Sequence, residues 1–234
     1  MKTAYIVKAY RTAVGKAPKG VFRFKRPDEL AAETLEYMFK ELPELDKTRI
    51  DDVMVGNAMP EAEQGLNMAR LISLMGLKIE DVPGVTVNRY CASGIETIGM
   101  ATAKIQSGMA ECIIAGGAES MSYIPMGGYK PTPDYALAKD GHEDYYWGMG
   151  LTAEAVANEF KISREDQDAF AFSSHEKALK AQAEGKFKDQ IVPINIEETF
   201  LDESGKKSIR SYTVTQDEGP RKGTNVGALS KLRP

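Results

Sequence analysis

Cys91 is a residue whose type and position together permit covalent chemistry. Residues 85–87 (VTV) predict a short apolar strand, and a helix rich in small residues is predicted to run on from Cys91 to about Gly108. A cysteine at such a strand-to-helix junction lies where free backbone N–H groups and the positive end of the helix dipole converge. This setting favours the thiolate, which is the nucleophilic form, and the same N–H groups can hold an oxyanion. Position alone leaves both covalent catalysis and an inert, buried thiol open.

The remaining thiol and the two histidines give weaker signals. Cys112 lies in the apolar run 111–115, so we expect it to be a structural residue of a core strand. A general base must come within hydrogen-bond reach of its nucleophile. We expect neither histidine to do so, since His175 is predicted on the solvated face of a helix and His142 in a flexible loop. Two cysteines and two histidines without matching spacing predict no metal site, and no phosphate-binding or dinucleotide fingerprint is present.

Strands and helices are predicted to alternate over the first 120 residues. The expected strands are 4–7, 52–56, 85–87 and 111–115, and the expected helices are 28–41, 67–74 (closed by Gly76) and 91–108. Such alternation predicts an α/β fold in which a largely parallel sheet has helices on both faces. The small residues of the helix that follows Cys91 allow close approach from several directions, so we expect it to be central and buried.

The character of the sequence changes after residue 120. Residues 123–146 are rich in Gly, Pro and Tyr and predict irregular loop, followed by a short helix at 151–160. Ser163 and Asp166 resemble a capping box that opens a longer helix to about Gly185. A hairpin about residues 204–205 and a short helix near Leu229 complete the chain. We therefore predict two domains, a core at 1–120 and a second lobe at 121–234.

Composition and charge exclude several classes of protein. A net charge of −4 and a pI near 5.4 argue against nucleic-acid binding, which requires a basic surface. No stretch approaches the roughly 18 apolar residues of a membrane span, and no secretory leader is visible. Eleven methionines and two free thiols suit a reducing compartment, so we expect a cytoplasmic protein.

Four motifs resemble those of one enzyme family. Residues 88–94 (NRYCASG) resemble the nucleophile motif of the thiolases, which are acyltransferases that act on acyl-CoA. Residues 116–122 (GGAESMS), 149–154 (MGLTAE) and 11–15 (RTAVG) resemble three further thiolase motifs, and all four occur in family order. The resemblance covers the whole chain, but the chain stops where the family continues.

The resemblance implies a fold. Residues 1–120 correspond to the N-terminal thiolase core, a mixed and mostly parallel sheet between helix layers that carries the nucleophile. Residues 121–234 correspond to the α+β loop domain that covers CoA, and the second thiolase core is absent from this chain.

The resemblance also implies an activity. Thiolases cleave 3-oxoacyl-CoA with CoA to acetyl-CoA and a shortened acyl-CoA, or run the reverse Claisen condensation, and Cys91 matches the acylated cysteine. Arg221 matches the arginine that packs near the adenine of CoA, and Met149 matches a methionine that lines the pantetheine channel. CoA enters as a substrate, and no cofactor is implied. The base and most oxyanion donors belong to the absent half, so we expect the chain alone to be inactive.

Two details of the resemblance concern subclass and assembly. Gly148 stands where biosynthetic thiolases typically carry histidine, so the chain is more similar to the degradative 3-ketoacyl-CoA thiolases of fatty-acid β-oxidation. The loop from Gln64 to Arg70 resembles one that crosses the family's dimer interface, where the third strand pairs with its twofold copy. A homodimer through this sheet edge is therefore expected.

Two other functions stay open at the level of sequence. One is a stand-alone CoA- or acyl-binding module without turnover, which would share Cys91 and Arg221. The other is a condensing enzyme of the ketoacyl synthase type, although residues 88–94 and 149–154 speak against it.

Overall fold

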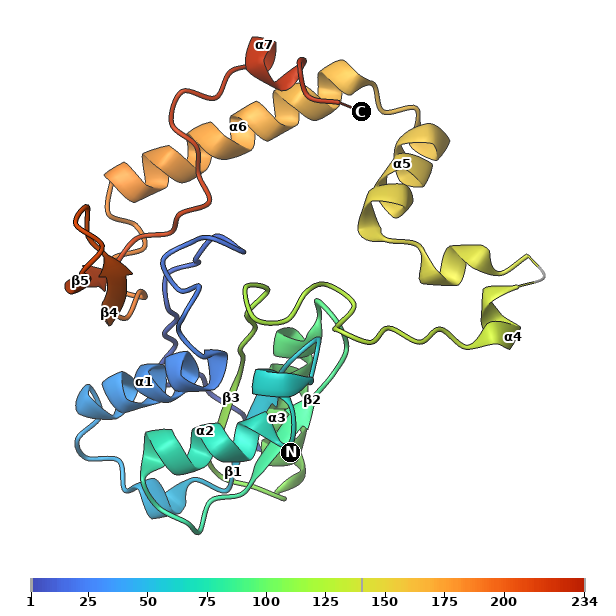
Figure 1. Cartoon of the computed structure of the whole chain (residues 1–234). Coiled ribbons are helices and arrows are strands. Elements are labelled where there is room, and N and C mark those ends of the chain that lie inside the picture. Colours follow the sequence, from blue (N-terminus) through green and yellow to red (C-terminus); the bar gives the residue numbers. More distant parts are fainter. Residues whose placement is uncertain (1, 140, 234) are drawn as a thin grey trace. The chain divides into compact units, whose positions relative to one another are not determined.

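The computed structural model describes residues 2–139 and 141–233, which divide between two compact units (Figure 1). The first unit consists of the chain up to Tyr129 together with Lys188–Gly219, and the second consists of Lys130–Phe187 and the segment from Pro220 onward.

A three-stranded parallel sheet forms the centre of the first unit. Strand β1 (Asp52–Gly56) lies between β2 (Gly84–Val87) and β3 (Ile113–Gly117), so the strand order is β2-β1-β3. Both pairings are parallel, with Val53 opposite Gly84 and Ile114. Every residue of β1 is buried, as expected for the middle strand of a sheet covered on both faces. The prediction of a parallel α/β core is confirmed.

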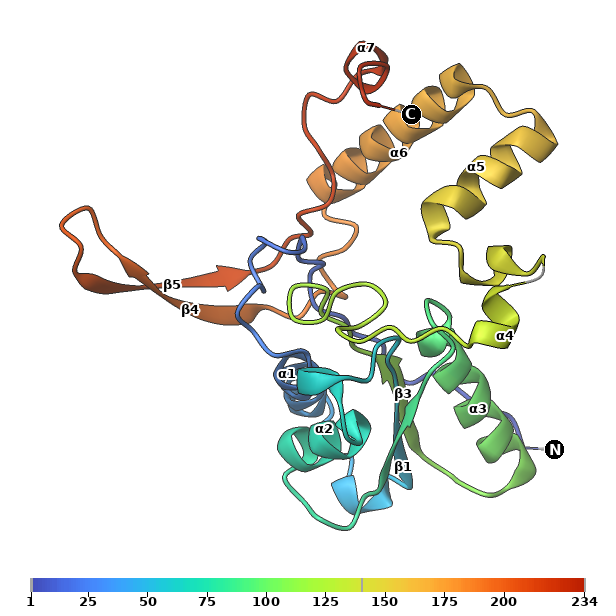
Figure 2. The same ribbon diagram turned by 45° about the vertical axis from the view of Figure 1, so that its right-hand side comes forward.

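Helices cover both faces of this sheet. Figure 2 shows α1 (Pro27–Lys40) and α2 (Met68–Leu77) on one side of the strands and α3 (Ser93–Ser107) on the other. The first two helices and β1 bury one apolar cluster, which consists of Phe39, Ile50, Val53, Val55, Met68, Ala69, Ile72, Leu77 and Val82. Two short 3₁₀ turns, η1 (Lys47–Arg49) and η2 (Ala62–Gln64), connect these elements.

Helix α2 ends later than the sequence predicts. Asn67 caps its start by accepting a hydrogen bond from the Arg70 N–H, but Gly76 lies inside the helix instead of closing it. Lys78 ends the helix in the left-handed conformation, with φ of 60°. A Cβ at position 76 would come within 2.9 Å of Leu35 Cβ, so this glycine serves the close packing of α1 on α2.

Helix α3 is buried on one face only, which corrects the prediction of a central buried helix. Ser93, Thr97 and Ala101 face the sheet and are buried, whereas Ile95 is 69% exposed. The small residues allow a close approach to β1 and β3. Nothing among the described residues covers the opposite face at Ile95, and this is why the helix lacks its second buried side.

The predicted strand at residues 4–7 does not form. Tyr5, Ile6 and Val7 are each at least 76% exposed and belong to no strand. An apolar run becomes a strand only when a neighbour supplies ladder hydrogen bonds. The described part of the chain offers these residues no such neighbour, and the nearest bridge joins Arg11 to Ile191.

An antiparallel hairpin belongs to the first unit. Strands β4 (Ile194–Leu201) and β5 (Lys207–Val214) pair about the turn at Gly205, where φ is 76°. Its base packs on Ala13 and Phe22 of the N-terminal loop in a second apolar cluster. The division into compact units therefore differs from the predicted boundary at residue 120, because this packing joins residues 188–219 to the core.

The second unit is helical. It contains α4 (Tyr135–Ala138), η3 (Glu143–Tyr146), α5 (Met149–Phe160), α6 (Arg164–Ala183) and α7 (Val226–Leu229). The predicted capping box is present, since Ser163 accepts from the Asp166 N–H and Asp166 accepts from the Ser163 N–H. Arg164 fixes α7 to α6 by donating hydrogen bonds to the Leu229 and Leu232 carbonyls. In the described part of both units, no helix is long and apolar enough to cross a membrane.

Candidate active site

A sharp turn joins β2 to α3 and carries Cys91. Tyr90 adopts the left-handed conformation with φ of 47°, which is uncommon for a residue with a bulky side chain. The Tyr90 N–H donates to Asn88 Oδ1 at 2.9 Å, and the Tyr90 carbonyl accepts from Ser93 Oγ at 2.6 Å. Ser93 Oγ also accepts from the Arg89 N–H at 2.8 Å. The side chains of Asn88 and Ser93 thus hold the turn from both ends.

Glycines let the start of α3 lie directly on the carboxyl ends of the strands. A Cβ at Gly56, the last residue of β1, would come within 2.4 Å of the Ser93 carbonyl carbon and 2.7 Å of the Gly94 nitrogen. A Cβ at Gly117, which ends β3, would come within 3.4 Å of Gly94 Cα. The turn therefore stands at the carboxyl edge of a parallel sheet, where open α/β sheets bind their ligands.

A polar network holds the loops beneath the turn. Glu119, in the second motif, accepts from the Ala58 N–H and from Gln64 Nε2, each at 2.6 Å. Gln64 is fully buried, and its Oε1 accepts from the Ser120 N–H. The Ala58 carbonyl in turn accepts from Asn88 Nδ2 at 3.1 Å. Hydrogen bonds thus join the loops after all three strands.

Asn57 contributes a buried polar atom at the same edge. Its N–H donates to the Val87 carbonyl, and its Nδ2 donates to the Ala118 carbonyl at 2.9 Å. The side chain is 1% exposed, yet Oδ1 has no hydrogen-bond partner among the described residues. A buried acceptor is costly unless a donor satisfies it, so this position fits a bound water or a donor from a ligand.

Cys91 is exposed, as a nucleophile requires, and it lies just before Ala92, the N-cap residue of α3. The N-cap residue, Ala92, makes no side-chain capping hydrogen bond. The N–H groups of Ala92 and Ser93 donate to the Arg89 and Tyr90 carbonyls, and the helix dipole together with the remaining N–H groups of the first turn attracts negative charge. The arrangement can therefore stabilise an oxyanion formed beside Cys91.

Cys112 has the opposite environment. It lies just before β3, half-buried against the first apolar cluster, and this burial raises the pKa of its thiol. The Cys112 N–H donates to Asp51 Oδ2 at 3.0 Å, so the backbone before β3 is tied to the residue that precedes β1. These contacts agree with the predicted structural role.

Met149 and Arg221 lie in the second unit. Met149 begins α5 and is 60% exposed. The Arg221 N–H donates to His175 Nδ1 at 3.2 Å, so the backbone at Arg221 is tied to α6. No hydrogen bond or ion pair between described residues joins Met149 to Arg221. Their assignment to CoA stays a prediction.

Both histidines also belong to the second unit. His142 is exposed and stacks on Tyr145 with ring centroids 4.8 Å apart. His175 is half-buried and accepts the hydrogen bond from Arg221, so it is less solvated than its sequence position indicates. No group of three or more metal-binding side chains occurs within residues 2–139 and 141–233.

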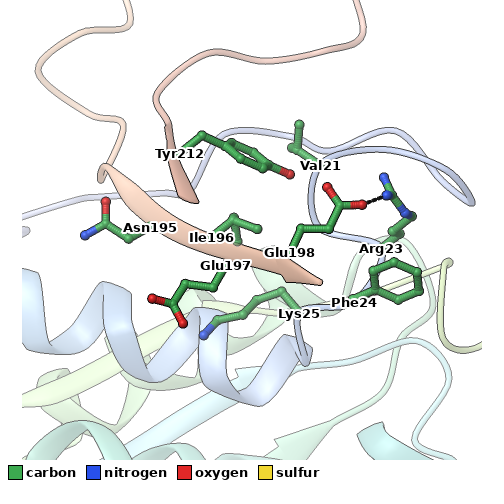
Figure 3. Close-up of a pocket in the computed structure, with 9 residues that line it drawn as sticks. All are labelled: Val21, Arg23, Phe24, Lys25, Asn195, Ile196, Glu197, Glu198 and Tyr212. Carbon is green, nitrogen blue, oxygen red and sulfur yellow. Dashed lines mark ion pairs between the residues drawn. The ribbon is translucent and has the colours of Figure 1, made fainter. Parts of the chain in front are cut away.

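A separate hollow of about 380 Å³ lies between the 21–25 loop and the hairpin (Figure 3). Three of its charged groups are already matched, because Glu198 forms ion pairs with both Arg23 and Arg210 and Lys25 pairs with Glu29. No residue of the Cys91 turn lines it. This hollow is not the candidate site.

Comparison with known proteins decides the family. The family model described as "Thiolase, N-terminal domain" matches residues 4–234. The chain belongs to the thiolase family. This thiolase chain is 49% identical to "3-ketoacyl-CoA thiolase" of Bacillus subtilis, over its whole length and 59% of the relative's. It is 37% identical to "Probable acetyl-CoA acyltransferase" of Staphylococcus aureus, covering 60% of that protein.

A human relative gives the same family. The chain is 38% identical to "3-ketoacyl-CoA thiolase, peroxisomal" of Homo sapiens over 98% of its own length and 53% of the relative's. The thiolase chain thus spans between half and two thirds of the curated relatives it matches. The family match gives no support to the ketoacyl synthase alternative.

The sequence does not predict the polar network. It indicates only that Gln64 lies in a loop at the dimer interface and that Glu119 belongs to a motif. The available signal is that Asn57 and Asn88 directly follow the predicted strands at 52–56 and 85–87, and that Glu119 follows the predicted strand at 111–115 by four residues. Such positions meet at one edge of a parallel sheet.

Proposed function

We propose that this chain is the N-terminal part of a thiolase that cleaves 3-oxoacyl-CoA with CoA to acetyl-CoA and a shortened acyl-CoA. The observation that carries the proposal is an exposed Cys91 at the uncapped start of α3 in a chain of the thiolase family. The names of the relatives support the substrate class, since they are a 3-ketoacyl-CoA thiolase and a probable acetyl-CoA acyltransferase.

The proposed reaction has two acyl transfers. In the first, the Cys91 thiolate attacks the keto carbon, and the start of α3 stabilises the oxyanion. The bond between the keto carbon and the adjacent CH₂ then breaks. Its electron pair, with one proton, becomes the methyl C–H of acetyl-CoA, while the shortened acyl group remains on Cys91 as a thioester. In the second, the CoA thiol loses its proton to a base, attacks this thioester and releases the Cys91 thiolate.

This chain supplies the nucleophile and its support. We assign the base and the remaining oxyanion donors to the part of the relatives that this chain does not span. General acid–base help is worth roughly 10²–10⁴-fold and a lost oxyanion donor costs about 10²–10³-fold, so the chain alone should not turn over at an enzymatic rate.

Three finer assignments belong to the same proposal. CoA is bound through Arg221 and the region of Met149 as substrate, and no cofactor is needed. The protein acts in fatty-acid β-oxidation in the cytoplasm, where its free thiols stay reduced. The enzyme is a homodimer that pairs through the open edge of β2 and the loop from Gln64 to Arg70, because among the described residues β2 has a partner strand on one side only.

Loss of the enolate absorbance of acetoacetyl-CoA in the presence of CoA tests the activity. Three proteins are compared: the chain, an extended protein in which the C-terminal remainder of the Bacillus subtilis relative follows residue 234, and the extended protein with Cys91→Ala. We expect turnover only in the extended protein with Cys91 intact. Robust Cys91-dependent turnover by the chain alone would mean that a base lies within it, with His142 the first residue to replace.

A binding module without turnover is the second candidate. It is favoured by the exposed Cys91 thiol, to which no described residue that could act as a base donates or accepts a hydrogen bond. Isothermal titration of the chain with CoA, together with sequencing of the gene past residue 234, separates the two. Tight CoA binding by the chain and a stop codon after residue 234 would support the module.

A further inference from the structure

Tyr90 occupies an unfavourable backbone conformation directly before Cys91. Left-handed φ is rare for residues with bulky side chains and persists only where surrounding contacts enforce it. The Tyr90 side chain is 68% exposed, so packing of its ring does not explain the conformation. The explanation must lie in the hydrogen bonds of its backbone.

Asn88 makes two of the bonds that define the turn. Its Oδ1 accepts from the Tyr90 N–H at 2.9 Å, which closes the turn around the strained residue. Its Nδ2 donates to the Ala58 carbonyl at 3.1 Å, which fastens the turn to the loop after β1. That loop is itself held by Glu119, through the Ala58 N–H at 2.6 Å.

Asn88 is exposed, so its carboxamide is not part of the apolar core. Asn57, which follows the neighbouring strand β1, has a buried Oδ1 without a hydrogen-bond partner among the described residues. This is a separate sign that the carboxyl edge of the sheet accepts a hydrogen bond from a bound group. Removal of the Asn88 side chain should therefore disturb the turn and leave the fold intact.

We propose that Asn88 is a positioning residue for Cys91: its Oδ1 holds Tyr90 left-handed and so directs the thiol to the start of α3. The proposal rests on the proposed function of Cys91 as the nucleophile. Asn88 does not touch the reacting atoms, and it acts on them through the Tyr90 backbone.

Alkylation of Cys91 in the folded chain tests this without any need for turnover. The rates of reaction with neutral iodoacetamide and with anionic iodoacetate are measured by peptide mass spectrometry. The positive start of α3 attracts the anionic reagent, so the ratio of iodoacetate to iodoacetamide rates reports where the thiol points. Cys112, half-buried in the same unit, reports any general loosening in the same digest.

Three variants give the contrast. Asn88→Ala removes both hydrogen bonds, and Asn88→Ser keeps an uncharged acceptor for the Tyr90 N–H but loses the donor to Ala58. Asn195→Ala, an exposed asparagine of β4 that pairs with Thr213, is the matched control.

We expect Asn88→Ala to lower the alkylation rate of Cys91, and the ratio of the iodoacetate rate to the iodoacetamide rate, by roughly 2–10-fold. This factor corresponds to the free energy of one lost hydrogen bond. Asn88→Ser should lower both less than Asn88→Ala does, because its hydroxyl still accepts from Tyr90, and Asn195→Ala should change neither. Cys112 should react equally slowly in all of them. An unchanged ratio in Asn88→Ala, or an equal loss in Asn88→Ser, overturns the proposal. So does a parallel rise in Cys112 labelling, which would mean that Asn88 only stabilises the fold.

A second background isolates the conformation of Tyr90. Glycine adopts left-handed φ without cost, so Tyr90→Gly should make the turn less dependent on Asn88. Asn88→Ala should therefore lower the Cys91 rate and ratio less in the Tyr90→Gly protein than in the parent. An equal loss in both backgrounds contradicts the mechanism. If instead Cys91 depends on Asn88 but takes up no acyl group in the extended protein, the positioning role stands and the thiolase assignment fails.

Discussion

The carboxylate of Asp217 ties together segments that lie far apart in the sequence. It accepts two hydrogen bonds from Arg11, at 2.7 and 3.0 Å, and one from the Val14 N–H at 2.7 Å. The hydrogen bond from Arg11 is the main reason that the pKa of Asp217 lies below its ordinary value of 3.8. The motif at residues 11–15 is thereby fastened to the segment that leaves the hairpin.

This contact predicts a pH-dependent stability. Because the folded pKa of Asp217 is depressed, its contribution is complete above the unfolded value of 3.8 and is lost as the pH falls through the folded value. Asp217→Asn should lower the free energy of unfolding by about 1–3 kcal/mol at neutral pH, and by less below pH 3.8. Urea denaturation at several pH values measures this, with exposed Glu203→Gln as the control. A pH-independent loss would contradict it.

Arg221 carries a prediction about substrate binding. Its side chain forms no ion pair with any described residue, so the guanidinium is available for a phosphate or an adenine ring. In the extended protein, Arg221→Ala should raise the KM for CoA more than it lowers kcat, because contacts remote from the reacting carbon bind ground and transition states alike. The neighbouring Lys222→Ala is the control. A collapsed kcat with an unchanged KM would remove Arg221 from the CoA site.

The sequence predicts the position of some site residues but not the contacts of others. Cys91 is predicted because its motif and its strand-to-helix position are both local in the sequence. The hydrogen bonds of Asn88 to Ala58, and of Glu119 to Gln64, join loops that are distant in the chain. Such contacts appear only when the strand order is known, since residue type alone does not say which loops meet.

At the scale of elements, Gly56 determines how close α3 comes to β1. A Cβ there would lie 2.4 Å from backbone atoms of Ser93, which cannot move without shifting the helix. Gly56→Ala should destabilise the chain by about 1–3 kcal/mol, the usual result of overpacking a core. It should also change the ratio of iodoacetate to iodoacetamide alkylation rates at Cys91, because the start of α3 is displaced.

Gly99 supplies the matched control within α3. A Cβ at this exposed position would have no atom within 4 Å. Gly99→Ala should therefore stabilise the chain by about 0.5–1 kcal/mol, through helix propensity alone. Thermal unfolding of the two variants compares them directly. Equal effects in both would mean that the close contact at Gly56 does not matter.

Elements with a local signal are predicted well, and those that depend on partners are not. The capping box of Ser163 and the hairpin about Gly205 follow from residue types at fixed spacing, and both are present. Residues 4–7 and the outer face of α3 have the composition of buried elements but lack a covering neighbour among the described residues. Whether an apolar segment is buried depends on what else packs there.

At the scale of the whole molecule, the exposed apolar surface predicts self-association. Ile6 and Ile95 are 81% and 69% exposed in the first unit, and Phe170 is 76% exposed in the second. Exposed apolar side chains drive association in water where they gather on a surface, as consecutive residues 5–7 allow. Light scattering after gel filtration should show concentration-dependent association of the chain, and the extended protein should bind less of a fluorescent apolar dye. A monodisperse monomer at high concentration would contradict this.

The most direct test of the central claim is to identify the residue that carries the acyl group. The extended protein is incubated with acetoacetyl-CoA without free CoA, quenched in acid and digested, and the peptides are analysed by mass spectrometry. We predict one acetyl group on the peptide that contains Cys91, removed when CoA is added before the quench and absent from Cys91→Ala. An acetyl group on Cys112, or full turnover by Cys91→Ala, would contradict the account.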